Sequence, residues 1–293
     1  MRILVTGASG LLGHQLVKSA IDKGHEVYAV YKENPINLGK PVQIDLTEQT
    51  TVFKTIRKIK PQAIVHAAAY TDVDSCETNK KLALEVNAEV TKHIATVAAE
   101  LNSHVIYVST DYVFNGDKGL YVEEDQTDPI NHYGYTKLKG EEYVKRYAKS
   151  WCIARPSVIY GWSHTGKLNF ATWIINNLSM GKEIKVLVDQ HVSPTLNTNL
   201  AEMLLEIAEK RISGILHTAG ADRISRYDFA VKCAETFDLS ADLIEQAKIG
   251  EMPWKAKRPA DSSLNVSKAE NNLNVKPMKI DAALEKLKTT GTK

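Results

Sequence analysis

The sequence predicts an α/β protein with a doubly wound parallel β-sheet, followed by a smaller mixed α/β C-terminal region. Up to about residue 155, short runs rich in valine and isoleucine alternate with longer segments of helical periodicity, as in successive β-α-β units. The runs are almost continuously apolar, which is typical of strands buried on both faces. After Arg155 and Pro156 the alternation stops, and single elements follow between glycine, proline and asparagine residues.

Six strands and three helices make up the predicted sheet region. The strands are expected at residues 3–5, 27–31, 42–44, 63–66, 105–108 and 152–154. Apolar residues at helical spacing fill residues 12–21, 52–59 and 86–101. We expect Gly24 to cap the first helix, Thr47 to open the second and Pro61 to stop it.

Composition limits the classes of partner. With 293 residues and 43% hydrophobic side chains, the chain can bury one large core or two small ones. The formal net charge is only +2 and no long block of like charges occurs, so nucleic acid is not expected as a partner. No run reaches the roughly 18 apolar residues of a membrane span, and the first strand leaves no room for a signal peptide. Neither a membrane nor export is expected.

The three cysteines are Cys76, Cys152 and Cys233, which are far apart and lack CxxC spacing. An odd number without such spacing argues against a disulfide framework and against a structural zinc. The sequence shows no metal-ligand cluster, so no metal site is expected. A reducing, cytoplasmic location fits these cysteines best.

A glycine-rich turn lies between the first strand and the first helix. Glycines at this place give a tight turn, close approach of the backbone to a phosphate, and close packing of the helix. The alternative is a glycine-rich turn that packs tightly and binds nothing. As a phosphate site, the turn would bind a dinucleotide through Gly7, Ser9, Gly10, Leu11, Leu12 and Gly13.

These patterns divide the chain into two regions. Residues 1–155 are expected to form a dinucleotide-binding Rossmann-type domain. Segments later in the chain could add to its sheet. Residues 156–293 are expected to form a substrate-binding cap at the carboxyl edge of the sheet, where open α/β folds bind ligands. In the cap, helices are expected near residues 171–178, 200–209 and 227–237, and strands near residues 184–188 and 215–217.

The end of the second strand bears on the choice of cofactor. An acidic residue there would bond the ribose 2′-hydroxyl of NAD, whereas a basic residue would accept the 2′-phosphate of NADP. The chain has Tyr31, Lys32 and Glu33 at this place, which favours NADP(H) and leaves NAD(H) possible. Asp45 and Leu46, at the end of the third strand, are expected at the adenine edge, although Asp45 could instead cap the next helix.

Three alanines follow the fourth strand. Ala67, Ala68 and Ala69 have side chains small enough to let a dinucleotide lie flat against the backbone. Plain tight packing is the alternative explanation for each of them. Their position at the carboxyl edge of the sheet makes them expected cofactor contacts.

Tyr133 and Lys137 are four residues apart and share one face if a helix begins near Tyr133. A free tyrosine titrates near pH ~10, so it exchanges protons poorly at neutral pH unless a cation lowers its pKa. Lys137 would supply that cation, and both side chains could reach one cofactor ribose. Alone, the pair could be a solvated surface pair. A hydroxyl after the fifth strand could hold a substrate carbonyl, and of Ser109 and Thr110 we expect Thr110 to do so.

With these residues in place, the chain resembles the extended short-chain dehydrogenase/reductases, and within them the dTDP-4-dehydrorhamnose reductase family. The GxxGxxG spacing of the turn is typical of these proteins, and the match runs over nearly the whole chain. Its main stretches are residues 5–13 (VTGASGLLG), 67–74 (AAAYTDVD), 109–116 (STDYVFNG) and 133–141 (YGYTKLKGE). Later matches are Asp189-Gln190, Pro194-Thr195, Arg258-Pro259 and residues 262–264.

The resemblance implies NADPH-linked reduction of the 4-keto group of dTDP-6-deoxy-L-lyxo-4-hexulose to dTDP-L-rhamnose. It also implies that Tyr133 gives the proton, that Lys137 holds the ribose and tunes Tyr133, and that Thr110 bonds the ketone. Family members often form homodimers. The residues that the resemblance places against the nucleotide sugar are Thr71, Val73, Thr110, Asp111, Tyr112, Tyr133 and Arg258.

The chain departs from the family pattern at two places. Relatives usually carry a tryptophan where this chain has Val158, so a sugar-stacking contact is missing unless Trp162 replaces it. Residues 189–195 lack the glycine that usually precedes the proline of this loop.

Two rival functions are compatible with the same motifs. An epimerase or dehydratase of the same superfamily would use Tyr133 and Lys137 but keep NAD bound through its cycle. A non-catalytic protein resembling the regulatory subunit of methionine adenosyltransferase would bind a dinucleotide without reaction. The complete set of Thr110, Tyr133 and Lys137 argues against this second rival.

Overall fold

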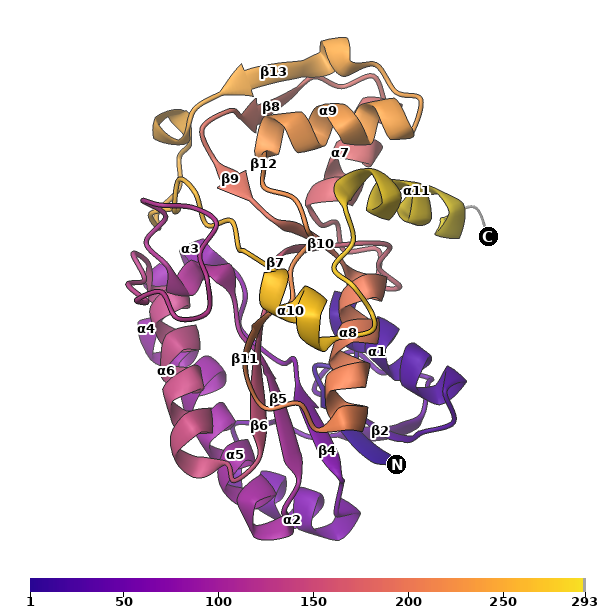
Figure 1. Cartoon of the computed structure of the whole chain (residues 1–293), viewed down its shortest axis with the longest axis vertical. Coiled ribbons are helices and arrows are strands. Elements are labelled where there is room, and N and C mark those ends of the chain that lie inside the picture. Colours follow the sequence, from indigo (N-terminus) through magenta and orange to yellow (C-terminus); the bar gives the residue numbers. More distant parts are fainter. Residues whose placement is uncertain (292–293) are drawn as a thin grey trace.

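The computed structural model describes residues 1–291 and shows a sheet flanked by helices on both faces, with a smaller part above one edge of the sheet (Figure 1). The seven-stranded sheet has the order β11-β6-β5-β4-β1-β2-β3, and every neighbouring pair is parallel. This confirms the predicted doubly wound α/β fold. The strands are β1 (Arg2–Thr6), β2 (Glu26–Tyr31), β3 (Lys40–Gln43), β4 (Ala63–His66), β5 (His104–Val108), β6 (Trp151–Arg155) and β11 (Gly214–His217).

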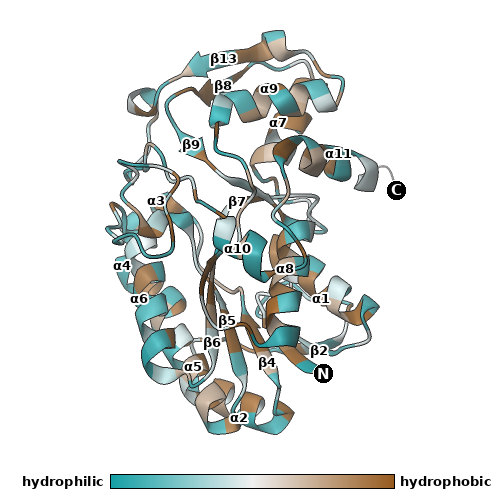
Figure 2. Cartoon of the chain, viewed as in Figure 1, coloured by the Kyte–Doolittle hydropathy of each residue, from teal (hydrophilic) through white to brown (hydrophobic). Residues whose placement is uncertain are grey.

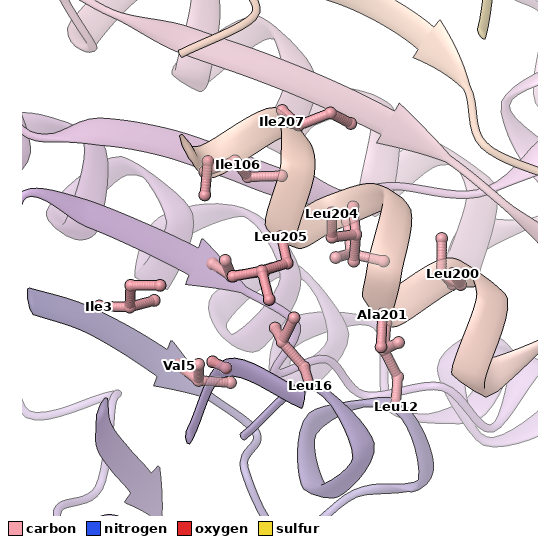
Figure 3. Packing of buried hydrophobic residues seen from close by; sticks show 14 of the residues in the cluster. Ile3, Val5, Leu12, Leu16, Ile106, Leu200, Ala201, Leu204, Leu205 and Ile207 are labelled. Atoms are coloured by element: carbon pink, nitrogen blue, oxygen red, sulfur yellow. The ribbon is translucent and has the colours of Figure 1, made fainter. Parts of the chain in front are cut away.

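Alternate residues of the central strands point into two separate cores. Ile3 and Val5 pack with helices α1 (Leu11–Asp22) and α8 (Asn197–Lys210) on one face (Figure 3). Leu4 packs with α2 (Gln49–Ile59), α5 (Val90–Leu101) and α6 (His132–Tyr147) on the other face. Figure 2 shows the matching hydropathy pattern, with brown central strands and teal outer helix surfaces. Burial on both faces holds for β1, β4 and β5.

The expectation of burial on both faces is wrong for β3. This strand pairs only with β2 at the edge of the sheet, and three of its four residues are exposed. Val42 is its only partly buried residue. An edge strand has a neighbour on one side only, so less of its surface is covered.

The expected helix boundaries need two corrections. Thr47 does not open α2, which begins after Glu48, because the Thr47 N–H and hydroxyl both donate to Asp45. Gly24 lies just past the end of α1 with φ +78°, a left-handed conformation that favours glycine. The third predicted helix starts earlier and is interrupted, as α4 (Lys80–Leu84), the π-helical turn η1 (Glu85–Glu89) and α5.

Two elements after residue 155 rejoin the sheet region. Helix α8 packs against α1, and β11 pairs with β6 as the seventh strand, so the sheet does not end at β6. Both were expected in the cap. We therefore assign α8 and β11 to the first region. The division of the chain between residues 155 and 156 stays a prediction.

The remaining elements form the smaller part, which has its own apolar core around Phe229 and Leu284. Its strands pair in twos, as β10 with β7, β12 with β9, and β13 with β8. Its strands are β7 (Ser157–Tyr160), β8 (Ile184–Leu187), β9 (His191–Val192), β10 (Pro194–Leu196), β12 (Ile224–Ser225) and β13 (Ile244–Ala247). Its helices are α7 (Phe170–Ser179), α9 (Arg226–Thr236) and α11 (Ile280–Thr290), with the short turns η3 (Ala241–Leu243) and η4 (Ile249–Glu251). Helix α10 (Ser267–Asn272) lies against β11.

Within residues 1–291, no helix combines the length and apolar character needed to cross a membrane. The same residues contain no group of three or more side chains arranged to hold a metal ion. All three cysteines are free and buried.

Candidate active site

The glycine turn is packed so closely that side chains are excluded. Gly7 has φ +66°, and a Cβ there would come within 2.8 Å of the Ala68 nitrogen. A Cβ on Gly13 would overlap the Gly7 carbonyl oxygen. The turn therefore lies directly beside the loop of Ala67, Ala68 and Ala69, here called the alanine loop. The two segments expected to bind the cofactor are thus neighbours.

The N-terminus of α1 has the character of a phosphate site. Gly10 is its N-cap residue, no side chain caps the helix, and its first turn contains no acidic residue. Backbone N–H groups at such a helix start carry partial positive charge, which favours a bound phosphate. The chain segment from Gly7 to Gly13 thus fits the pyrophosphate of a dinucleotide.

A buried hydrogen-bond chain holds the alanine loop in place. Thr6 Oγ1 accepts the Ala68 N–H at 3.2 Å and lies 2.7 Å from Nδ1 of His66, whose Nε2 lies 3.1 Å from Thr91 Oγ1. Thr91 in turn donates to the Asn87 carbonyl at 2.8 Å, so the neutral His66 ring carries its proton on Nε2. Burial lowers the pKa of His66 to about 3, which keeps the ring neutral.

Asn87 holds the other end of the loop. Its side chain accepts the Tyr70 N–H at 2.7 Å and donates to the Tyr70 carbonyl at 3.1 Å. It also donates to Thr136 of α6 at 3.0 Å, so one amide joins the loop to the helix that carries Tyr133. Sequence reasoning missed both His66 and Asn87, because a polar residue at the end of a strand or within a helix gives no sign of its partners.

The expected adenine end of the site contains an ion pair. Lys32 Nζ lies 2.9 Å from Asp45 Oδ2, and Gln43 donates to the Lys32 carbonyl at 3.1 Å. The bond between them raises the pKa of Lys32 and lowers the pKa of Asp45. Asp45 also accepts both Thr47 donors, so it organises the loop before α2 as well as pairing with Lys32. Tyr31 and Leu46 lie next to this pair in the chain and are partly buried.

Helix α6 begins immediately before Tyr133. Asn131 caps the helix by accepting the Gly134 N–H at 2.8 Å. Gly134 touches the Tyr112 carbonyl so closely that a Cβ would overlap it, which presses the start of α6 against the turn after β5. Tyr133 and Lys137 are therefore one helical turn apart at the carboxyl edge of the sheet.

Lys137 is almost fully buried, with 2% of its surface exposed. Its ammonium donates to the Val108 carbonyl at 2.7 Å and lies 4.2 Å from the ring centre of Tyr107. Burial lowers the pKa of Lys137 to about 7, and the Glu141 carboxylate opposes that shift. A lysine in this state can be neutral or charged near neutral pH, depending on what it contacts.

The expected lowering of the Tyr133 pKa by Lys137 is not seen. Burial raises the pKa of the Tyr133 phenol, and the group that opposes this shift is the Thr110 hydroxyl, through a hydrogen bond. The Lys137 ammonium is instead held by Val108 and the Tyr107 ring. Thr110, Tyr133 and Lys137 still meet at one edge of the sheet, with Thr110 in direct contact with the phenol.

The structure separates the two candidate hydroxyls. Ser109 donates to Glu141 at 2.6 Å, inside a buried pair in which Arg155 donates to both Glu141 oxygens at 2.8 and 2.7 Å. Thr110 instead faces Tyr133 and Asp111. Ser109 is therefore committed to the core, and Thr110 is the hydroxyl available to a substrate.

Both carboxylate oxygens of Asp111 accept hydrogen bonds from hydroxyl groups of the protein. Asp111 begins the single turn η2 (Asp111–Val113), and its Oδ1 accepts the Thr110 hydroxyl at 3.0 Å. Its Oδ2 accepts the hydroxyls of Ser157 and Ser262 at 2.8 and 2.6 Å. The structure thus brings Asp111 to the site as expected, but bonded to protein hydroxyls on both oxygens.

Arg258 is brought to the same edge by α3 (Val73–Thr78). Its guanidinium lies 3.1 Å from Asp74 and stacks 4.8 Å over Trp254. Asp74 also accepts the N–H groups of Lys255 and Ala256, which fastens this C-terminal segment to α3. Thr71 is exposed, and Val73, the first residue of α3, is partly exposed.

Arg226, at the start of α9, was missed by sequence reasoning. Its Nε donates to Gln190 at 3.1 Å, its guanidinium stacks 4.6 Å over Phe170, and it forms a hydrogen bond with Tyr112. Burial raises the pKa of the Tyr112 phenol, and the positive charges of Arg226 and Arg258 partly oppose this shift. Nothing in the local sequence around Arg226 shows that α9 points it toward the site.

Trp162 does not take the place of the tryptophan that relatives carry where this chain has Val158. Its indole N–H donates to the Leu287 carbonyl at 2.8 Å and its ring packs on Phe237, so it is committed to α11 and the cap core. Val158 has φ +40°, a strained conformation for a β-branched residue. The strain lies next to Ser157, the residue that bonds Asp111.

Comparison with known proteins identifies the family of this chain. The model of the RmlD substrate binding domain family matches residues 1–291. A dTDP-4-dehydrorhamnose reductase of Aggregatibacter actinomycetemcomitans is 33% identical over 300 aligned residues, covering 98% of each chain. The crystal structure of a hypothetical dTDP-4-dehydrorhamnose reductase from Sulfolobus tokodaii is 38% identical, with a TM-score of 0.87 over 95% of this chain and 97% of that one.

A third relative bears on the cofactor. The dTDP-4-dehydrorhamnose reductase of Bacillus anthracis, solved in complex with NADP, is 28% identical and has a TM-score of 0.89 over 99% of each chain. The match of the family model and the full-length relative at 33% identity show that the chain belongs to the RmlD substrate binding domain family, the family of the dTDP-4-dehydrorhamnose reductases.

Proposed function

We propose that this protein uses NADPH to reduce the 4-keto group of dTDP-6-deoxy-L-lyxo-4-hexulose, giving dTDP-L-rhamnose. The observation that carries the proposal is the meeting of Thr110, Tyr133 and Lys137 at the carboxyl edge of the sheet, beside a turn that fits a pyrophosphate. Full-length relatives bear the name of this reductase, which supports the choice of substrate.

The cofactor would lie across the turn after β1 and the alanine loop after β4. When bound, its reduced nicotinamide supplies the hydride, and the chain supplies the binding surface and the proton. NADP(H) is favoured and NAD(H) possible, because Lys32 stands where a 2′-phosphate would be met and a relative binds NADP. The residues proposed to hold it are Gly7, Ser9, Gly10, Leu11, Leu12, Gly13, Tyr31, Lys32, Asp45, Leu46, Ala67, Ala68, Ala69, Tyr133 and Lys137.

Tyr133 is the proposed proton donor to the ketone oxygen. Its phenol carries a proton at neutral pH, as an ordinary tyrosine does. Burial raises the pKa of this phenol, and the Thr110 hydroxyl opposes that shift, which favours release of the proton. Thr110 would donate its hydroxyl proton to the same ketone oxygen. The Lys137 ammonium, one helical turn from Tyr133, would bond the cofactor ribose.

The nucleotide sugar would lie between the turn after β5 and the cap. Thr71, Val73 and Tyr112 would contact the sugar, together with the Asp111 turn. Arg258 would meet the diphosphate, with the guanidinium plane suited to two phosphate oxygens. Arg226 adds a second positive charge beside Tyr112.

The test is NADPH oxidation with dTDP-6-deoxy-L-lyxo-4-hexulose and with other 4-keto sugar nucleotides side by side. We expect the first substrate to give the highest kcat/KM. A purified protein that retains stoichiometric NAD and turns over without added reduced cofactor would instead be an epimerase or dehydratase. Dinucleotide binding with no turnover on any of these sugars would indicate the non-catalytic rival.

We also propose a cytoplasmic location and a homodimer. Three free, buried cysteines support a reducing compartment. The homodimer rests on the resemblance alone. Light scattering coupled to size-exclusion chromatography measures the mass directly, and a monomer at micromolar concentration would contradict the homodimer.

A further inference from the structure

The hydrogen bonds of the Thr110 hydroxyl limit what it can do for a ketone. A threonine hydroxyl has one proton to donate and two positions at which to accept. Thr110 donates to Asp111 Oδ1 at 3.0 Å and accepts the Tyr112 N–H at 3.2 Å, which leaves one accepting position for Tyr133. A ketone oxygen can only accept, so Thr110 cannot bond it while its single proton goes to Asp111.

The surroundings of Asp111 suit a carboxylic acid. The side chain is 3% exposed, forms no ion pair within residues 1–291, and meets only hydroxyl groups. Two of these hydroxyls, from Ser157 and Ser262, donate to Oδ2. A proton on Oδ1 would keep both of these bonds and would reverse the bond to Thr110. Asp111 would then take the second accepting position of Thr110, which frees the Tyr133 phenol to bond the ketone oxygen.

We propose that Asp111 is a positioning residue that acts as a neutral acid, donating from Oδ1 to Thr110 so that Thr110 donates its own proton to the ketone. The inference rests on the proposed function. The proton of Asp111 stays on Asp111 throughout. The reduction consumes one hydride from the cofactor and one proton from Tyr133, which solvent later restores, so the reaction balances without any net transfer from Asp111.

The charges around Asp111 are compatible with this role. Burial raises the pKa of Asp111, while the hydroxyls of Ser262, Ser157 and Thr110 lower it. Arg226 also lowers it, as the least of these influences. The titratable groups that face Asp111 from neighbouring elements are Tyr112 in η2, Tyr133 in α6, Arg226 in α9 and, beyond Tyr112, Arg258.

The pH dependence has a definite sign. The neutral acid is the competent form, so competence is present below the pKa of Asp111 and is lost as the pH rises through it. Lys137, with its pKa lowered to about 7, loses its ammonium in the same direction. A pH profile of activity therefore combines two groups, and substitutions must separate them.

Turnover of matched variants distinguishes the acid from the carboxylate. In Asp111→Asn the amide donates to Thr110 while its oxygen accepts from the two serines, so we expect kcat within about tenfold of the wild type. Asp111→Ala and Thr110→Val lose this donor and should fall by roughly 100-fold or more, the scale of a lost transition-state hydrogen bond. If Asp111→Asn falls as far as Asp111→Ala while circular dichroism shows both folded, the ionised carboxylate is the working form and the proposal is overturned.

Infrared spectroscopy detects the proton on the Asp111 carboxyl group directly, without any measurement of turnover. In the complex with NADP⁺, the wild-type minus Asp111→Asn difference spectrum should show the C=O stretch of a protonated carboxylic acid at neutral pH. Ser262→Ala removes a bond that lowers the pKa of Asp111, so this band should persist to higher pH than in the wild type. A difference spectrum with only carboxylate bands at neutral pH would refute the neutral acid. Failure of the proposed function would appear separately, as a wild-type protein that reduces no 4-keto sugar nucleotide.

Discussion

Ser109 donates to Glu141 at 2.6 Å, deep in the core, although it is the immediate neighbour of the hydroxyl that meets Tyr133. Successive residues of an extended segment point to opposite sides, so two adjacent hydroxyls leave β5 with separate tasks. Ser109 serves the buried pair of Glu141 and Arg155, and Thr110 serves the site. This division gives a matched pair of substitutions.

We expect Ser109→Ala to reduce stability and Thr110→Val to reduce turnover. Loss of the Ser109 donor leaves a buried carboxylate short of one bond, which costs about 1–3 kcal/mol of the free energy of unfolding. Its kcat should stay within a few-fold of the wild type. Chemical denaturation and steady-state kinetics on both variants check the prediction, and a large loss of turnover confined to Ser109→Ala would reverse the two assignments.

Tyr133→Phe should separate binding from chemistry. The phenyl ring keeps the packing against Tyr112 but has no proton to give, so turnover should fall by about 100-fold or more. NADPH binding, followed by fluorescence titration, should remain close to that of the wild type. Undiminished turnover would remove Tyr133 from the mechanism.

The ammonium of Lys137 should make cofactor binding depend on pH. Its pKa is lowered to about 7 in the folded chain, so the charged form is present below that pH and is lost above it. We expect the affinity for NADPH to weaken as the pH rises through this range, and Lys137→Met to bind more weakly with a flatter profile. The Kd measured across pH for both proteins is the check, and parallel profiles would exclude Lys137 as the titrating group.

Lys137 should also affect stability, with the opposite sign. The pKa of this lysine is lower in the folded chain than in the unfolded chain, where it is near 10.4. Burying the ammonium therefore costs free energy below about pH 7, and this cost disappears as the pH rises from there toward 10. The free energies of unfolding of the wild type and of Lys137→Met, measured with denaturant, should differ less at alkaline pH than at acidic pH. A difference that does not change with pH would mean that Lys137 titrates normally.

Lys32 should decide the preference between the two dinucleotides. Lys32→Glu places a negative charge where the 2′-phosphate would lie, beside Asp45. We expect kcat/KM for NADPH to fall at least about tenfold, equivalent to roughly 1.4 kcal/mol, with a much smaller change for NADH. Lys40→Glu on the neighbouring strand is a control of equal charge change. Equal losses for both cofactors would place Lys32 outside the 2′-phosphate site.

Arg226 and Arg258 should govern affinity for the nucleotide sugar. Arg258→Ala and Arg226→Ala each remove a positive charge near Tyr112, and we expect KM for the sugar nucleotide to rise about 10-fold or more through loss of charge-assisted bonds. KM for NADPH should change little. Lys257→Ala, an exposed neighbour, is the control. Binding of dTDP compared with thymidine, by calorimetry, shows whether the lost affinity belongs to the diphosphate.

The sequence predicted the sheet well because the apolar residues of each central strand indicate by themselves that the strand is buried. Runs such as residues 63–66 are apolar whichever strands lie beside them, and β4 has those bounds. The same reasoning failed for β3 and placed β11 in the cap, because edge position and sheet membership depend on partners that the local residues do not specify. Thr47 was misassigned for a similar reason, since Asp45 competes for its hydrogen bonds.

By itself, the sequence determined the fold class, the glycine turn and the residue types of the site, because glycine spacing, strand periodicity and the Tyr133–Lys137 interval are local properties of the chain. Only the tertiary structure decided the hydrogen bonds among them. It assigned Ser109 to Glu141, bonded both oxygens of Asp111 to hydroxyls from the turn after β5, from β7 and from the C-terminal segment, and brought Arg226 to Tyr112. Such bonds join residues up to 151 positions apart, and only the packing of the cap on the sheet brings them within reach.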